Sequence, residues 1–127
     1  MLQGAILTAI LDLKTDEVLH IAIGQKGDEY SGSGGTFVIR ECANGSFEPI
    51  VISGGAGGDY YKKANEWCNA QLNEFGNGSK SGEINNNIGG SGTTGGAGYK
   101  TDAPKFSKGN CPKCFQGGLQ GGNYDTR

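Results

Sequence analysis

The sequence contains little proline, a single histidine and no excess of charge of either sign. Only 3 of its 127 residues are proline, against 25 glycines, so the proline-rich glycine repeat of collagen is excluded. The 11 basic and 13 acidic residues give a net charge of −2. They form neither the basic stripe of a nucleic-acid binder nor a polybasic patch for anionic membranes, so we expect no nucleic-acid partner.

A long hydrophobic run is also missing. Leu2 to Leu13 is apolar, but Gln3, Thr8 and Asp12 interrupt it and no Lys or Arg precedes it. It is too short and too polar to cross a bilayer, and it lacks the positively charged start of a signal peptide. We therefore predict no membrane span in this segment, and a β-strand over Gly4–Leu13.

Alternation of apolar residues predicts further strands in the first half of the chain. They cover Glu17–Gly24, Thr36–Glu41 and Pro49–Ser53, with a hairpin loop at Lys14–Asp16 and a tight turn at Asn44–Gly45. The sequence thus predicts one domain over residues 1–127, whose first part, 1–53, is an antiparallel β core.

The second part, 54–127, is predicted to hold one short helix and most of the glycine. Asp59 can cap a helix that runs to Leu72, and Gly76 lies just beyond its end. At about four turns this helix is marginal alone, so it must pack on another element.

Glycines recur at a spacing of three residues. A left-handed extended helix has three residues per turn, so such glycines line one edge and let neighbouring chains approach closely. We predict glycine-helix packing there, and the alternative is a flexible linker. The residues concerned are Gly24, Gly27, Gly32, Gly35, Gly55, Gly58, Gly89, Gly92, Gly95 and Gly98.

Cysteines and glycosylation sequons together indicate an oxidising, extracellular setting. The four cysteines are predicted to form two disulfides, Cys42 with Cys68 and Cys111 with Cys114, although the Cys-x-x-Cys pair could also be redox-active or half of a zinc site. Two Asn-Gly-Ser sequons place candidate glycans on Asn44 and Asn77.

No residue pattern predicts catalysis. His20, the only histidine, lies in a predicted strand with no serine or cysteine beside it, so a structural role is favoured over a catalytic base. We expect no enzyme activity, no catalytic residue, no cofactor and no metal site.

Three segments carry a resemblance to a known family. Val18–Gly27 ends in the letters IGQKG, residues 34–38 read GGTFV, and Pro49–Gly58 reads PIVISGGAGG. In this order they resemble the glycine-rich extracellular domain of the anaplastic lymphoma kinase and leukocyte tyrosine kinase receptors, over residues 4 to 122. Ser53 and Ala56 break the usual glycine run, and no kinase segment is present.

The resemblance implies a tumour-necrosis-factor-like β-sandwich beside packed glycine helices of the polyglycine II type. The sequence favours a non-catalytic structural or assembly module of a cell-surface or matrix protein, one that can form filaments. We expect the chain to be a fragment or repeat unit of a longer extracellular polypeptide, with copies of itself or neighbouring segments of that polypeptide as partners. A receptor ectodomain that binds a secreted protein ligand, and a glycine-rich adhesin, are the alternatives.

Overall fold

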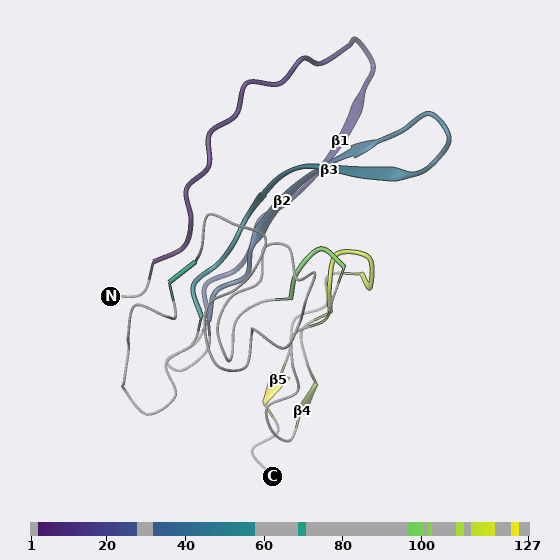
Figure 1. Ribbon diagram of the computed structural model, residues 1–127. Helices are drawn as coiled ribbons and strands as arrows, with labels where there is room; N and C mark the ends of the chain where they lie inside the picture. Colours follow the sequence, from purple (N-terminus) through teal and green to yellow (C-terminus); the bar gives the residue numbers. More distant parts are fainter. Residues whose placement is uncertain are drawn as a thin grey trace.

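The computed structural model describes residues 3–27, 32–57, 69–70, 97–100, 102, 109–110, 113–118 and 123–124. Within them the chain is mainly strand and contains no helix. Three strands form an antiparallel sheet in the order β1-β2-β3: β1 is Val18–Ala22, β2 is Thr36–Glu41 and β3 is Phe47–Ser53. A second pair joins β4, Gly109–Asn110, to β5, Asn123–Tyr124 (Figure 1).

The turn between β2 and β3 forms where the sequence predicts it. Gly45 has a φ of 79°, a left-handed conformation that costs glycine nothing. The amide of Cys42 donates to the carbonyl of Ser46 at 2.8 Å, and the amide of Gly45 donates to the carbonyl of Cys42 at 2.8 Å. These bonds set the register that pairs Glu41 with Phe47.

Proline is accommodated in β3 by a bulge. Val38 pairs with Val51 and Ile39 with Pro49, so Ile50 is an extra residue on the β3 side. β3 is an edge strand of the described sheet, the place where a missing N–H does least harm. The strand begins at Phe47, two residues before the predicted start at Pro49.

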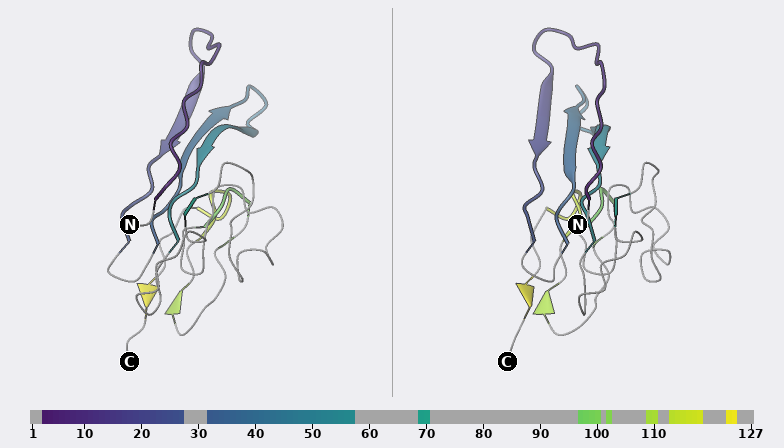
Figure 2. Two further views of the ribbon diagram at one scale, coloured as in Figure 1. Left: turned by 60° about the vertical axis from the view of Figure 1, so that its left-hand side comes forward. Right: turned by 90° about the vertical axis from the view of Figure 1, so that its left-hand side faces the viewer.

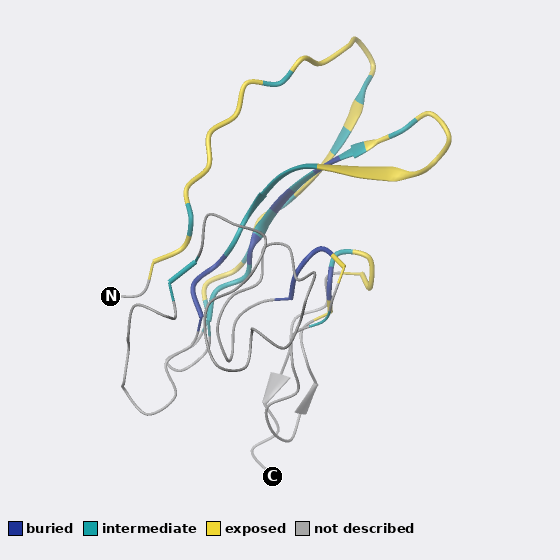
Figure 3. Cartoon of the chain, viewed as in Figure 1, coloured by how far each residue is buried: buried dark blue, intermediate teal, exposed yellow. Residues whose placement is uncertain are grey.

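The core lies on one face of this sheet. Phe37, Ile39 and Tyr99 are buried, and Ile39 is completely buried. The ring of Phe115 stacks on Tyr99 at 5.4 Å between centroids and lies 6.0 Å from that of Phe37. Residues 97–100 and 113–118 therefore cover the core face, as Figures 1 and 3 show.

Two expected elements differ from the structure. Residues 4–13 form no strand, although the amide of Ala5 donates to the carbonyl of Gly54. They run as an open arc on the side of the sheet away from residues 97–100 and 113–118 (Figures 1 and 2). An apolar segment forms a strand only where a partner strand supplies the hydrogen bonds, and the described chain supplies no partner strand along this arc.

The predicted helix is not helical at 69–70, because the amide of Ala70 donates to the carbonyl of Gln3 at 2.9 Å. The rest of the predicted helix lies outside the described residues. Among the residues described, no helix has the length and hydropathy that a membrane crossing requires.

Candidate functional site

The segments that extend from one end of the sheet are joined by backbone hydrogen bonds. Five short segments form a continuous series in which each is hydrogen-bonded to the next. In order they are Gln25, Ser33–Gly34, Gly54–Ala56, Gln3–Ala5 and Asn69–Ala70. The bonds are Gly34 N–H to Gln25 O at 2.9 Å, Ser33 N–H to Ala56 O at 2.9 Å, Ala5 N–H to Gly54 O at 3.0 Å and Ala70 N–H to Gln3 O at 2.9 Å. Side chains reinforce it: the amide of Ala56 donates to Ser33 Oγ at 2.8 Å.

Glycine is required where these segments pass closest. A Cβ at Gly24 would lie 2.1 Å from the carbonyl oxygen of Gly34, and a Cβ at Gly55 would lie 2.2 Å from that of Ser33. From the other side, a Cβ at Gly34 would lie 3.0 Å from the Cα of Gly24. We call Gly24, Gly34 and Gly55, with the segments they join, the glycine crossing.

The sheet itself places the glycine crossing. Gly24 follows the end of β1 by two residues, Gly34 precedes β2 by two and Gly55 follows β3 by two. Because neighbouring strands are antiparallel, these three ends meet at the same end of the sheet (Figure 2). The hydrogen-bonded strands therefore continue directly into the glycine crossing.

The glycines predicted from spacing fall into two groups. Gly24, Gly27, Gly32, Gly35, Gly55 and Gly98 lie in the described residues, whereas Gly58, Gly89, Gly92 and Gly95 lie outside them. Gly24 and Gly55 are at the close approach just described, and Gly35 and Gly98 are buried. Three-residue spacing missed Gly34; the doublet Gly34–Gly35 immediately before a strand was the available signal.

A polar cluster surrounds Cys114. The carboxylate of Asp102 accepts from Lys113 Nζ at 2.6 Å and from the amide of Cys114 at 2.9 Å. The Lys113 hydrogen bond, followed by that from the Cys114 amide, lowers the pKa of Asp102. The amide of Gly117 donates to Cys114 Sγ at 3.2 Å, and the sulfur is largely buried. The cluster ties the 113–118 turn to the core side of the fold.

The structure holds Cys42 and Cys114 as free cysteines, whereas the sequence predicts a disulfide at each. Their predicted partners, Cys68 and Cys111, lie outside the described residues, so the pairing stays a prediction. In the described part of the chain, no three His, Cys, Asp or Glu residues gather in a way that could hold a metal ion.

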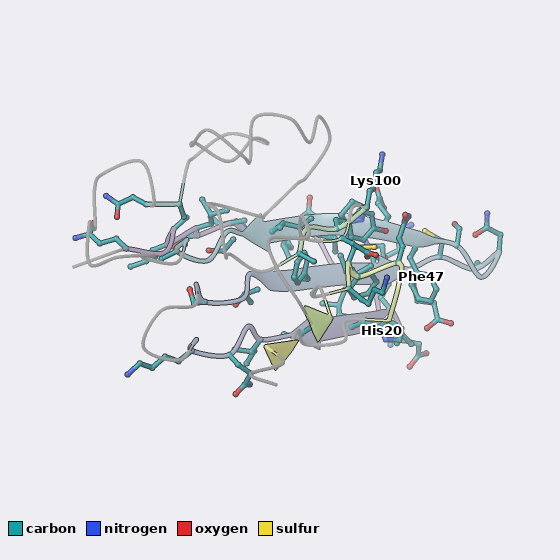
Figure 4. The ribbon with its side chains drawn as sticks, turned by 90° about the horizontal axis from the view of Figure 1, so that it is seen from below. His20, Phe47 and Lys100 are labelled. Carbon is teal, nitrogen blue, oxygen red and sulfur yellow. The ribbon has the colours of Figure 1, made fainter. Side chains whose placement is uncertain are left out.

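His20 lies on the surface rather than in a site. Its Nε2 is 2.7 Å from the Glu41 carboxylate, and its ring meets the ring of Phe47 edge-on at 5.3 Å (Figure 4). Both side chains are nearly half exposed, at 44% and 43%, and exposed contacts of this kind add little stability. The contacts link the three strands at the end opposite the glycine crossing.

The first sequon lies in the exposed turn between β2 and β3. Asn44 Oδ1 accepts hydrogen bonds from the amide of Ser46 at 2.9 Å and from its hydroxyl at 2.6 Å. The Asn44 side-chain nitrogen is thus left on the surface of the turn. Asn77, in the second sequon, lies outside the described residues.

Comparison of the chain with protein-family models, curated proteins and solved structures found no match.

Proposed function

We propose that this chain is a non-catalytic structural module of the cell surface or extracellular matrix, and that it acts by assembly. The single observation that carries the proposal is the glycine crossing, where segments far apart in sequence lie backbone against backbone. Such packing leaves no room for a Cβ at Gly24 or at Gly55. It makes a stiff, hydrogen-bonded array that further segments can extend.

The finer architecture is part of the proposal. Glycine helices of the polyglycine II type continue the crossing through the glycine-rich residues 89–98, and the sheet is one layer of a tumour-necrosis-factor-like sandwich. The resemblance to the glycine-rich receptor domain supports this, since β1, β2 and β3 each overlap one of its three signature segments. Backbone dihedrals of residues 89–98, measured by NMR in labelled protein, should fall near φ −75° and ψ +145°.

Electron microscopy of the purified chain tests the assembly function directly. Filaments or sheets in micrographs, together with a sedimentation coefficient that rises with concentration, are the expected result. Monodisperse monomers at all concentrations would overturn it and would favour the alternative, a receptor ectodomain fragment that binds a secreted protein ligand.

The extracellular location has its own test at Asn44. The turn holds this side chain on the surface, which favours its use as a glycan acceptor in a secretory host. Enzymatic removal of N-glycans should reduce the mass of secreted protein, and Asn44→Gln should remove the glycan at this site. Protein that remains inside the cell, or is secreted without a glycan on Asn44, would count against this placement.

A further inference from the structure

The arc that precedes β1 is attached to the sheet at its two ends. At one end, the amide of Ala5 donates to the carbonyl of Gly54 at 3.0 Å, just past the last residue of β3. At the other end, Arg40 Nη2 donates to the carbonyl of Asp12 at 3.4 Å. Arg40 is paired with Glu48, near the start of β3. The segment between these two ends therefore runs antiparallel to β3 and spans its length.

The middle of the arc, residues 6–11, bows away from the sheet (Figure 1). In the part of the chain that the structure describes, these residues form no hydrogen bond. β3 is an edge strand of the described sheet, and an edge strand can pair with one more strand on its outer side. The arc has the direction and the end contacts of such a strand, yet it is not paired.

The hydrogen-bond pattern of β2 and β3 shows which way Pro49 faces. In antiparallel strands, pairs that exchange hydrogen bonds alternate with pairs that do not. The amide of Cys42 donates to the carbonyl of Ser46, which makes these two a hydrogen-bonded pair. Arg40 and Glu48 form the next such pair, so the backbone of Pro49, one residue further along, faces away from β2. The backbone nitrogen of Pro49 therefore lies on the outer side of β3, the side on which the arc begins.

The bulge at Ile50 keeps this pattern regular along the outer side of β3. Because Ile50 is an extra residue, it and Val51 together occupy one position opposite Val38. The outward-facing positions are then Gly54, Ile52, Pro49 and Phe47, and the arc residues that would pair with them are Ala5, Leu7, Ala9 and Leu11, respectively. The bond from Ala5 to Gly54 already forms at the first of these pairs. Of the four outward positions, only Pro49 has no N–H to donate.

We propose that Pro49 holds the arc out of the sheet, and that the arc is poised to close on β3 as a fourth strand. Pro49 offers no N–H to the carbonyl of Ala9, and its ring occupies the place where that hydrogen would lie, so pairing stops in the middle of the row. The neighbouring position favours pairing, because Leu7, which is 44% exposed, would lie beside Ile52, whose side chain packs against the core. This role of Pro49 is independent of the assembly function.

Hydrogen exchange of the whole chain, followed by NMR, tests this role with Pro49→Val. In the wild type the hydrogen-bonded amide of Ala5 should exchange slowly. The amides of Leu7, Ala9 and Leu11, which have no partner in the described chain, should exchange at the rate of an exposed segment. Valine supplies the missing N–H and favours a strand, so in Pro49→Val these three amides should exchange at least about tenfold more slowly.

Two proline substitutions in the Pro49→Val background form a matched pair. Ala9→Pro removes the arc's own donor opposite position 49, so the exchange of Leu7 and Leu11 should return to the wild-type rate. Thr8→Pro removes an N–H that would point away from β3, so the slow exchange should remain.

Slow exchange of the Ile39 amide, in the central strand, identifies the variants that are folded, and Pro49→Thr replaces Pro49→Val if the valine variant is not. Arc amides that are already protected in the wild type would overturn the proposal, because the arc would then be paired despite Pro49. Arc amides that stay unprotected in the folded variant would also overturn it, because the proline would then not be what prevents pairing. Equal protection in the Ala9→Pro and Thr8→Pro variants would refute pairing with β3 in this register.

Discussion

Adding one methyl group at Gly24 is the sharpest test of the glycine crossing. The new Cβ of Gly24→Ala would lie 2.1 Å from the carbonyl oxygen of Gly34 and 2.6 Å from that of Gly35. Both obstacles are backbone atoms just before β2, so no side-chain rotation can relieve the clash. One of the two segments must move, and the hydrogen bond from Gly34 to Gln25 is the contact that such a movement breaks.

The expected loss of stability follows from these contacts. Overpacking in a well-packed region costs about 1–3 kcal/mol, and a lost backbone hydrogen bond adds about 1 kcal/mol. Against this, alanine stabilises by about 0.4–1 kcal/mol because it restricts the unfolded chain. Gly24→Ala should therefore lower the free energy of unfolding by about 1–3.5 kcal/mol, which corresponds to a fall in melting temperature of roughly 5–15 °C.

Gly4→Ala is the matched control. Its added Cβ would lie 3.5 Å from the carbonyl oxygen of Gly54, an ordinary van der Waals contact, and Gly4 does not have a positive φ. The same methyl should therefore be neutral or stabilising by up to about 1 kcal/mol. Urea unfolding followed by far-ultraviolet circular dichroism gives both values. If the two variants differ by less than about 0.5 kcal/mol, the close approach at Gly24 does not exist in solution.

Four further predictions concern the rest of the fold. Gly45→Ala should cost about 1 kcal/mol in the same urea experiment through its φ of 79° alone, since nothing lies within 4 Å of the added Cβ; a neutral variant would mean that the turn relaxes. Tyr99→Phe removes the hydroxyl that donates to Phe47 O at 3.3 Å and should cost about 1 kcal/mol, whereas no change would show that the bond is not formed. Because the pKa of Asp102 is lowered in the folded protein, its ion pair with Lys113 stabilises the fold above roughly pH 4, and this stability is lost as the pH falls through the lowered pKa. Lys113→Gln should raise the pKa of Asp102 in a carboxyl NMR titration, and an unchanged pKa would contradict the contact between Lys113 and Asp102. If the chain forms two disulfides, alkylation of the unreduced, denatured protein should label none of the four cysteines, and stoichiometric labelling would refute the pairing.

The three-stranded sheet could be predicted because its signals are local. In Thr36–Glu41 the alternate residues Phe37 and Ile39 are buried, as a strand with one face on the core requires. Asn44–Gly45 fixes the following turn, because the left-handed conformation needed there suits glycine.

The parts of the fold that the sequence did not predict depend on contacts between residues far apart in the chain. Residues 4–13 are rich in apolar residues, but that composition does not say whether a partner strand lies alongside, and in the described chain none does. Ala70 lies in a good helical pattern, yet its amide bonds to Gln3. Gly34 does not follow the three-residue spacing, because its role comes from two other segments of the chain, at Gly24 and Gly55, that both approach it.

The close approach of Gly24 and Gly55 to Gly34 connects the sheet to the proposed function. A Cβ at Gly24 and one at Gly55 would both press on the carbonyl oxygen of Gly34, at 2.1 Å and 2.5 Å. Since β2 is the central strand, a shift of Gly34 that relieves one neighbour worsens the contact with the other. The crossing therefore fixes the position of all three strands at one end of the sheet. A sheet held at one end by its own backbone keeps its shape, and the proposed assembly function needs this rigidity.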